Sequence, residues 1–294
     1  MIHTELIASV GELIHQHAKT KSDKIAFRDS RTAVTYGQLA DATANLAGHL
    51  QDAGIEPADS VAIFLPNSVE WIESCFGIVW AGAVAVPISY DSTMQEVAYR
   101  VSDANCKAIF TTDERAEMVS TLATEYPNLE TIVFIERGTV PASGVRYSDL
   151  RKREPKSIAR DSTKIDSPSF IVYTSGTTGR PKGVLLSQRS MLWVAAACWV
   201  PIAGLNEHDY VLSALPLFHS YALNLSVLSI LAVGASEYIL EKFSTSEMMM
   251  LLKSGEFSVL PGVPTMFHYL LEAARADPDH RFSGLRVCLS AGAI

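Results

Sequence analysis

Short apolar runs rich in β-branched residues alternate along the chain with longer segments in which apolar residues recur every three or four positions. This alternation is the feature that most constrains the fold. The runs expected as strands are residues 61–64, 84–87, 108–111, 132–135, 170–174, 184–186, 211–214, 236–240 and 287–290. The segments expected as helices are residues 39–50, 68–80, 188–198, 221–232, 246–254 and 265–276. Such alternation is typical of a largely parallel sheet flanked by helices, so we predict an α/β fold.

The composition changes between residues 151 and 168, where the chain becomes charged and poor in apolar residues. We interpret this stretch as a surface connection between two lobes. A basic docking site for a partner is the weaker alternative, because acidic residues compensate the basic ones. The sequence therefore predicts a first lobe over 1–168 and a second over 169–294, incomplete at its C-terminus, with ligands bound at strand ends near the cleft between them.

Length and charge exclude several classes of function. The 294 residues are 48% hydrophobic, which is enough to bury a sizeable core. The formal net charge is −8, so the chain lacks the basic field that proteins use to bind nucleic acids or anionic membranes. We expect no nucleic-acid partner, and any bound anion must be held by local groups.

No segment reads as a membrane span or a secretory signal. The longest nearly unbroken apolar stretch, 191–205, is shorter than the about 20 residues that a spanning helix needs, and it contains Pro201. Glu5 and Glu12 stand where a secretory signal is basic and then apolar. We expect a cytoplasmic protein without a transmembrane segment. The isolated cysteines, Cys75, Cys106, Cys198 and Cys288, are expected to be reduced core residues.

One segment carries a chemical signature: YTSGTTGRPKGV at residues 173–184, which joins the strand ending at Thr174 to the run 184–186. Its glycines allow the backbone to approach a ligand closely, and its hydroxyl and cationic side chains add hydrogen-bond donors. Such a loop suits a polyphosphate. It is not a Walker A loop, because Pro181 precedes the lysine and the spacing differs. A flexible linker, and a hydrolase that uses Ser175, are the disfavoured alternatives.

This segment resembles the phosphate-loop motif of the adenylate-forming superfamily, which includes acyl-CoA synthetases, peptide-synthetase adenylation domains and luciferases. Other segments resemble that family's motifs in the same order: VTYGQL at 34–39, WAGAVAVP at 80–87, LPLFHSY at 215–221 and SAGA at 290–293. The resemblance covers the whole chain and is nearest to fatty-acyl and other carboxylate–CoA ligases. It implies the large N-terminal domain of such an enzyme.

The resemblance also implies a two-step reaction. A carboxylic acid, expected to be a fatty acid, attacks the α-phosphorus of ATP and forms an acyl-adenylate with release of pyrophosphate. The thiol of coenzyme A, or of a carrier's phosphopantetheine, then displaces AMP and forms a thioester. ATP, Mg²⁺ and coenzyme A are the implied cofactors, and a homodimer is left open.

Residue roles follow from the resemblance by position. The residues implied to cradle the β- and γ-phosphates are Thr174, Ser175, Gly176, Thr177, Thr178 and Gly179. Lys182 would provide a mobile cation for the pyrophosphate, and the Thr174 oxygen would lie near Mg²⁺. His219 would lie by the acyl pocket and the reacting carboxylate. A positioning role is favoured over general-base chemistry for this histidine, because a carboxylate is already ionised near neutral pH.

Further residues have weaker implied roles. Ser290, Ala291 and Gly292 would contact the substrate. The turn at 261–265 resembles part of the family's acyl-binding wall, although an ordinary helix-capping turn explains it equally well. We expect the methionines at 248–250 to pack in the core rather than to form a lipid-binding surface.

The sequence departs from the family pattern at two places. It has Gln188-Arg189-Ser190 where the family often has His-x-Asn. The family's metal-binding glutamate, ribose-binding aspartate and C-terminal domain would lie beyond Ala293, close to the last residue, Ile294. We therefore expect the N-terminal part of a ligase, with weak nucleotide binding at most and no thioester formation by this part alone. A short, non-catalytic nucleotide- or acyl-binding protein is the alternative.

Overall fold

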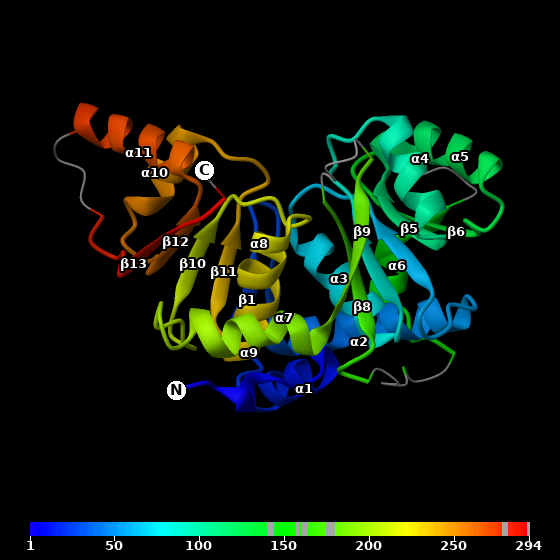
Figure 1. The fold of residues 1–294 in the computed structure, drawn as a ribbon, viewed down its shortest axis with the longest axis horizontal. Coiled ribbons are helices and arrows are strands. Elements are labelled where there is room, and N and C mark those ends of the chain that lie inside the picture. Colours follow the sequence, from blue (N-terminus) through cyan, green and yellow to red (C-terminus); the bar gives the residue numbers. More distant parts are fainter. Residues whose placement is uncertain (140–143, 157–158, 160–163, 175–179, 278–281, 293–294) are drawn as a thin grey trace.

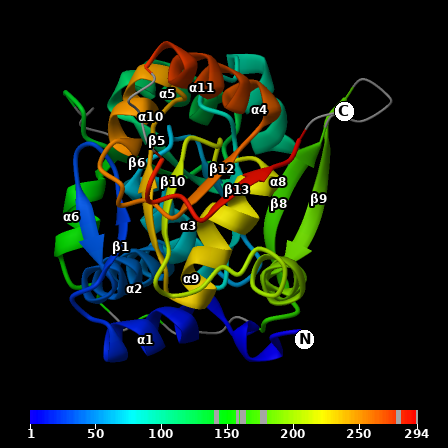
Figure 2. The same ribbon diagram turned by 90° about the vertical axis from the view of Figure 1, so that its left-hand side faces the viewer.

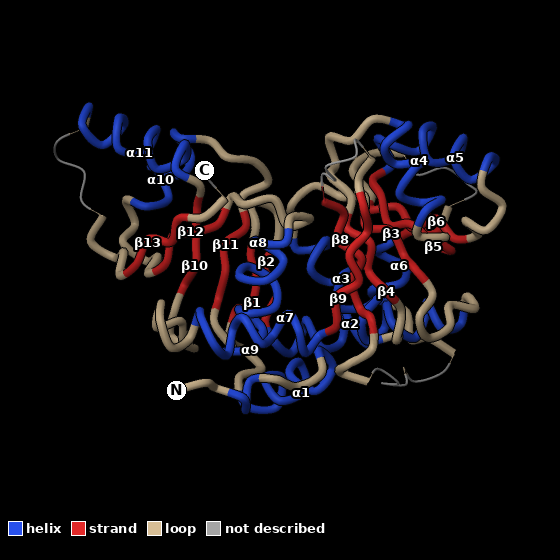
Figure 3. The backbone as a smooth tube through the Cα atoms, viewed as in Figure 1, coloured by secondary structure: helices blue, strands red, loops and turns tan. Residues whose placement is uncertain are grey.

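The computed structural model describes residues 1–294 except 140–143, 157–158, 160–163, 175–179, 278–281 and 293–294. Two sheets stand next to each other with helices around and between them (Figures 1 and 3). Their strand orders are β13-β12-β10-β11-β1-β2, called here the β10 sheet, and β7-β6-β5-β3-β4-β8-β9, called the β3 sheet. Among the described strands, all neighbours run parallel except β1 with β2 and β8 with β9. The predicted α/β fold is confirmed.

Every predicted strand is present to within two residues at each end. The β10 sheet consists of β1 (Ile25–Arg28), β2 (Ala33–Thr35), β10 (Tyr210–Ser213), β11 (Ser236–Ile239), β12 (Val259–Gly262) and β13 (Val287–Ser290). The β3 sheet consists of β3 (Ser60–Ile63), β4 (Val84–Pro87), β5 (Cys106–Thr112), β6 (Thr131–Ile135), β7 (Val145–Arg146), β8 (Pro168–Thr174) and β9 (Lys182–Ser187). The sequence analysis does not predict β1, β2, β7 or β12; β2 and β7 have only three and two residues, and β12 contains Pro261 and Gly262, which favour turns.

The predicted helices are also present. The α-helices are α1 (Val10–Thr20), α2 (Tyr36–Asp52), α3 (Val69–Trp80), α4 (Met94–Asp103), α5 (Ala116–Glu125), α6 (Tyr147–Lys152), α7 (Gln188–Val194), α8 (Ser220–Ala222), α9 (Ile230–Val233), α10 (Thr245–Leu252) and α11 (Pro264–Ala276). Short 3₁₀ turns form η1 (Thr4–Leu6) and η2 (Asp113–Arg115). The predicted helices 188–198 and 221–232 continue from α7 and α8 into the π-helical segments η3 (Ala195–Trp199) and η4 (Leu223–Ser229).

Helix α3 lies in the core shared by the two sheets. Its first turn is capped by Ser68, whose hydroxyl accepts a hydrogen bond from the Trp71 amide at 3.2 Å. The sequence offers Asn67 and Ser68 as caps for this helix, and the structure uses Ser68. The helix is buried along nearly its whole length, and its Phe76 ring lies 6.1 Å from that of Phe27 on β1. Because α3 also packs on β3 and β4, one apolar core runs through both sheets.

The two sheets do not divide the chain at residue 168, so the predicted lobes 1–168 and 169–294 need correction. Strand β1 pairs with β11, with Phe27 opposite Glu237, and therefore belongs to the β10 sheet. Strand β8 pairs with β4, with Ala85 opposite Phe170, and belongs with β9 to the β3 sheet. Apolar periodicity identifies a strand but not the sheet it joins. The charged stretch thus leads from α6, beside β6 and β7, to another strand of the same sheet.

Several predictions of burial are confirmed and others are wrong. Cys75 and Cys106 are buried, but Cys198 is half-buried and Cys288 is exposed on β13, a strand at the edge of its sheet. Among the methionines, Met248 and Met249 are buried while Met250 is 64% exposed, because α10 turns it away from the core. None of the described helices combines the length and the apolar character that spanning a bilayer requires.

Candidate functional site

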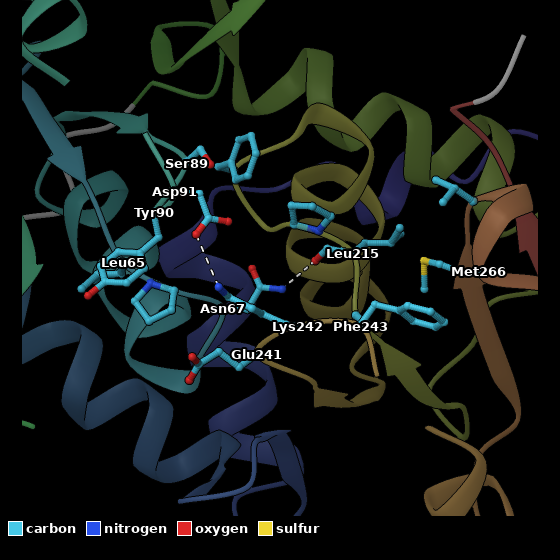
Figure 4. Close-up of a pocket in the computed structure, with 15 residues that line it drawn as sticks. Leu65, Asn67, Ser89, Tyr90, Asp91, Leu215, Glu241, Lys242, Phe243 and Met266 are labelled. Atoms are coloured by element: carbon cyan, nitrogen blue, oxygen red, sulfur yellow. Dashed lines mark hydrogen bonds and ion pairs between the residues drawn. The ribbon is translucent and has the colours of Figure 1, made fainter. Parts of the chain in front are cut away.

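The carboxyl ends of strands from both sheets surround a pocket of about 430 Å³ (Figure 4). Its walls follow β3, β4, β10, β11 and β12: Leu65, Pro66, Asn67, Ser89, Tyr90, Asp91, Ala214, Leu215, Pro216, Phe218, Glu241, Lys242, Phe243, Val263 and Met266. Open α/β sheets bind ligands at this edge, where the strand ends leave a crevice. The sequence analysis predicts ligands at strand ends near the cleft between two lobes, and this pocket lies at strand ends of both sheets.

Most of the pocket wall is apolar, and its polar groups gather where the two sheets face each other. Lys242 and Asp91 form an ion pair of 3.4 Å across the pocket (Figure 4). Both side chains are largely exposed, so this pair contributes little to stability. A mostly apolar pocket with a few convergent polar groups is the usual form of a small-molecule site.

The candidate phosphate loop lies at the end of a β-hairpin. Thr174, the last residue of β8, pairs directly with Lys182, the first residue of β9, and both are exposed. The predicted residues between them, Ser175, Gly176, Thr177, Thr178 and Gly179, lie outside the described residues. The structure therefore brings together Thr174 and Lys182, the described residues nearest to this segment on β8 and β9.

Helix α4 holds this hairpin from the side. The Tyr99 hydroxyl donates to the carbonyl oxygen of Pro181 at 2.8 Å. The Tyr173 hydroxyl, from the hairpin, donates to the Asp103 carboxylate at 2.7 Å, and the two tyrosine rings lie 6.1 Å apart. Burial, and next the Asp103 carboxylate, raise the pKa of Tyr173, so its hydroxyl stays a neutral donor. Each strand of the hairpin is thus fixed one residue away from the predicted phosphate contacts.

His219 caps helix α8. Its Nδ1 accepts a hydrogen bond from the Tyr221 amide at 3.3 Å, and within the described part of the chain Nε2 has no partner. The histidine is exposed, and the residue before it, Phe218, lines the pocket while His219 does not. His219 therefore lies next to the pocket wall, with one ring nitrogen committed to the helix cap.

The predicted substrate residues Ser290, Ala291 and Gly292 lie at the end of β13, close to the helix that His219 caps. Ser290 pairs with Gly262, and the Ala291 amide donates to the Gly262 carbonyl at 3.3 Å. Gly292 has a φ of +76°, a conformation that favours glycine. The turn predicted at 261–265 is present, since β12 ends at Gly262 and α11 begins at Pro264.

Tyr221 connects these residues to α8. Its hydroxyl donates to the Leu289 carbonyl at 3.2 Å, and burial raises its pKa to about 12, which keeps it a neutral donor. The structure thus links the helix that His219 caps to β13 at the residue before Ser290, and it pairs Thr174 directly with Lys182. Within the described residues, no hydrogen bond or ion pair joins these two groups.

Among the described residues, no group of three or more His, Cys, Asp or Glu side chains is arranged to hold a metal ion. Mg²⁺ keeps several waters and usually binds substrate phosphates together with one or two protein oxygens. The exposed hydroxyl of Thr174 at its strand end is compatible with that mode of binding.

The sequence prediction missed several residues at this site. In the sequence, Asn67 is a candidate only for a helix cap, and Tyr99, Asp91 and Lys242 are not predicted to have any role at the site. Asn67 could have been found from its place just after a buried strand, since the carboxyl ends of parallel strands carry binding residues. No sequence signal identified the others, because their partners lie far along the chain.

Comparison with known proteins places the chain in a family. A family profile described as AMP-binding enzyme matches residues 14–294. The chain belongs to the AMP-binding enzyme family. A curated member, a naringenin synthase of Pestalotiopsis fici, is 33% identical over 97% of this chain and 11% of its own length. Another, a 4-hydroxybenzoate–CoA/benzoate–CoA ligase of Rhodopseudomonas palustris, is 29% identical over 94% of this chain and 51% of its own length.

The chain therefore spans about half of the length of these relatives, or less. Solved structures give the same fold. The anthranilate CoA ligase AuaEII, solved in complex with anthranoyl-AMP, superposes with a TM-score of 0.90 at 23% identity. That match covers 100% of this chain and 57% of the other. The predicted resemblance to adenylate-forming enzymes is thus confirmed.

Proposed function

We propose that this chain carries the ATP site and part of the carboxylate site of an AMP-forming acid–thiol ligase. In the first step a carboxylate oxygen attacks the α-phosphorus of ATP, and the bond to pyrophosphate breaks. In the second step a thiol of coenzyme A or of a carrier's phosphopantetheine attacks the acyl carbon, gives up its proton, and AMP leaves. The observation that carries the proposal is the hydroxyl- and glycine-rich hairpin loop, flanked by paired Thr174 and Lys182, in a member of the AMP-binding family.

The hairpin suits the phosphate side of this reaction. Phosphoryl and nucleotidyl transfer depend mainly on aligning the reactants and neutralising negative charge. Lys182 is exposed at the start of β9, so its flexible ammonium group can follow the leaving pyrophosphate. Bound Mg²⁺ would add positive charge between phosphate oxygens and would be held in part by the Thr174 oxygen. The loop residues 175–179 are proposed to donate to the β- and γ-phosphates.

The pocket and His219 suit the carboxylate side. The carboxylate is ionised near neutral pH and needs orientation rather than deprotonation. His219 is proposed to orient it through Nε2, since Nδ1 is used by the helix cap. Ser290, Ala291 and Gly292 are proposed to contact the substrate or the adenylate; they directly follow Leu289, whose carbonyl bonds to Tyr221 of the same helix.

A fatty acid is the proposed substrate, because the nearby pocket wall is mostly apolar. An aromatic acid is the second candidate, because a relative is named as a 4-hydroxybenzoate–CoA/benzoate–CoA ligase. A panel of fatty and aromatic acids in the same assay separates the two. The homodimer and the cytoplasmic location remain predictions.

Carboxylate-dependent exchange of pyrophosphate into ATP, measured on the protein in its full length, tests the proposal. Lys182→Ala is expected to lower the exchange rate about tenfold or more, since a charge-assisted contact to phosphate is lost. Lys253→Ala is the matched control, because that lysine pairs only with Asp277 at the surface among the described ion pairs. Absence of exchange in the parent, or exchange that Lys182→Ala leaves unchanged, would contradict the proposal.

The alternative is a protein that binds a nucleotide or an acyl group without turnover. Titration calorimetry with ATP and with fatty acid distinguishes it from the ligase. Binding in the absence of exchange would favour the alternative.

A further inference from the structure

Asn67 lies just beyond β3, and its side chain joins the β3 sheet to two loops of the β10 sheet. Its Nδ2 donates to the carbonyl oxygen of Leu215 at 2.9 Å and to that of Leu240 at 3.2 Å. Its Oδ1 accepts from the Leu217 amide at 2.9 Å. Figure 4 shows Asn67 between the two sheets with its bond to Leu215. One half-buried amide therefore uses both donors and its acceptor on backbone groups of the opposite sheet.

The contacts with Leu215 and Leu217 resemble those of a neighbouring strand. A strand partner would offer one donor and one acceptor to alternate residues, and the Asn67 amide does the same. Pro216 stands between the two leucines and has no amide proton, so this loop has little backbone bonding of its own. The turn that follows is short, since the His219 amide donates back to the Pro216 carbonyl at 2.9 Å. Fixing Leu215 and Leu217 thus fixes the start of α8.

Ion pairs also join the two sheets at this edge, and these hold the sheets less firmly than the hydrogen bonds of Asn67. The pair of Asp91 with Lys242 is exposed, and that of Arg137 with Glu241 spans 3.3 Å with a half-exposed glutamate. Exposed ion pairs hold two flexible side chains loosely. Asn67 has a short side chain, and its three bonds have normal hydrogen-bond lengths. It is therefore the rigid link at the pocket.

We propose that Asn67 is a positioning residue. It holds loop 214–219 against the β3 sheet, and so fixes one wall of the pocket and the helix start that His219 caps. It acts on the carboxylate side of the site and not on the phosphate side, because the β8–β9 hairpin is held separately by Tyr99 and Asp103. The kinetic part of this inference rests on the proposed function, whereas the structural part does not.

The structural part is tested by amide hydrogen exchange on the full-length protein. Asn67→Asp keeps an acceptor for the Leu217 amide but turns a carboxylate oxygen toward two carbonyl oxygens, and Asn67→Ala removes all three bonds. Asn45→Ala is the matched control, because Asn45 is a half-buried asparagine that donates to the Arg151 carbonyl at 3.0 Å, away from the pocket. We expect exchange in the peptide covering 214–222 to become about tenfold faster in both Asn67 variants.

The kinetic part is tested by the KM values for the two substrates in pyrophosphate exchange. Asn67→Asp is expected to raise KM for the carboxylic acid about fivefold and to leave KM for ATP within about twofold of the parent. Asn45→Ala should change neither value. A structural role alone would lower the amount of folded enzyme and leave both KM values as they are.

The outcomes separate cleanly. Loop exchange no faster than in Asn45→Ala, or KM values that rise together for both substrates, would overturn the inference. If Asn67→Ala does not fold, Asn67→Asp decides. If the parent shows no exchange of pyrophosphate, the proposed function fails, and the hydrogen-exchange result alone decides whether Asn67 positions the loop.

Discussion

Glu237 is an acidic residue within β11, a strand of the β10 sheet. Its side chain is fully buried, and neither oxygen has a hydrogen-bond partner among the described residues. The nearby Ser226 and Ser213 hydroxyls act to lower the pKa of Glu237, but the effect of burial outweighs them. Burial raises the pKa of Glu237 well above its ordinary value of 4.5, so the folded protein favours the neutral acid.

This burial makes stability depend on pH in a defined direction. Below pH 4.5 the carboxyl is neutral in both the folded and the unfolded chain, so no ionised group has to be neutralised when it is buried. Above that pH the unfolded chain ionises and the folded chain does not, so the free energy of unfolding falls by up to about 1.4 kcal/mol per pH unit until the folded pKa is reached. Glu237→Gln removes the titration. In urea unfolding, the free energy of unfolding of Glu237→Gln relative to that of the parent should rise from pH 5 to pH 8. The same difference in free energy at both pH values would contradict this.

Residues that match family motifs also have structural tasks of their own. In the segment 34–39, the Thr35 hydroxyl caps α2 by accepting from the Gln38 amide at 3.3 Å, and the Tyr36 hydroxyl donates to the Ala235 carbonyl at 2.7 Å. In the segment 80–87, Gly82 has a φ of +85° where the chain turns from α3 into β4. The residues of these motifs therefore have a role in the fold as well as in the proposed reaction.

Among the elements, the hairpin β8–β9 and helix α4 form a unit, and Figure 2 shows the hairpin standing at one side of the molecule. Tyr99→Phe removes the hydroxyl that holds the Pro181 carbonyl but keeps the ring beside Tyr173. We expect a loss of about 1 kcal/mol in the free energy of unfolding and a two- to fivefold rise, roughly, in KM for ATP, with KM for the carboxylic acid unchanged.

Tyr269→Phe provides the control for this change, because Tyr269 is 52% exposed on α11. Both variants are compared in pyrophosphate exchange and in thermal unfolding. A KM for ATP equal to that of the parent in Tyr99→Phe would show that α4 does not position the loop.

Sequence reasoning identified elements better than their arrangement. Apolar periodicity identified most of the strands and helices, but it missed α1, α4 and α5, and it does not detect the wider turns of η3 and η4 or the sheet that β1 joins. The phosphate loop was recognised because its chemistry lies within one short segment. Asn67 was not, because its partner Leu215 lies 148 residues away and a single asparagine has no pattern. Contacts across the chain appear only when the fold is known.

At the scale of the molecule, the two sheets share one core. Buried residues of both sheets and of α3 belong to a single apolar cluster. Asp29, the residue after β1, adds polar contacts with α3. Its carboxylate accepts hydrogen bonds from the Arg31 and Thr32 amides and, at 2.9 Å, from the Val69 amide at the start of α3. Neither sheet can therefore lose its partner without exposing core.

We expect the whole chain to unfold in urea as one cooperative unit despite its two sheets. Hydrogen exchange at increasing urea concentrations measures this, with peptides from β5 and β6 reporting one sheet and peptides from β10 and β11 the other. The urea midpoints for the peptides of the two sheets should coincide. Exchange of the β10 sheet at clearly lower urea would show that the sheets are independent units.

The position of β1 also has a consequence for synthesis on the ribosome. The Ser236 hydroxyl at the start of β11 bonds to the Ile25 carbonyl of β1, and the two residues are 211 positions apart. At translation rates of about 5–20 residues per second, β11 is synthesised roughly 10–40 s after β1. Phe27, fully buried in the finished fold, lacks its neighbour on β11 during that interval. We therefore expect the edge of β1 to be open to chaperones that bind apolar segments until β11 has left the ribosome.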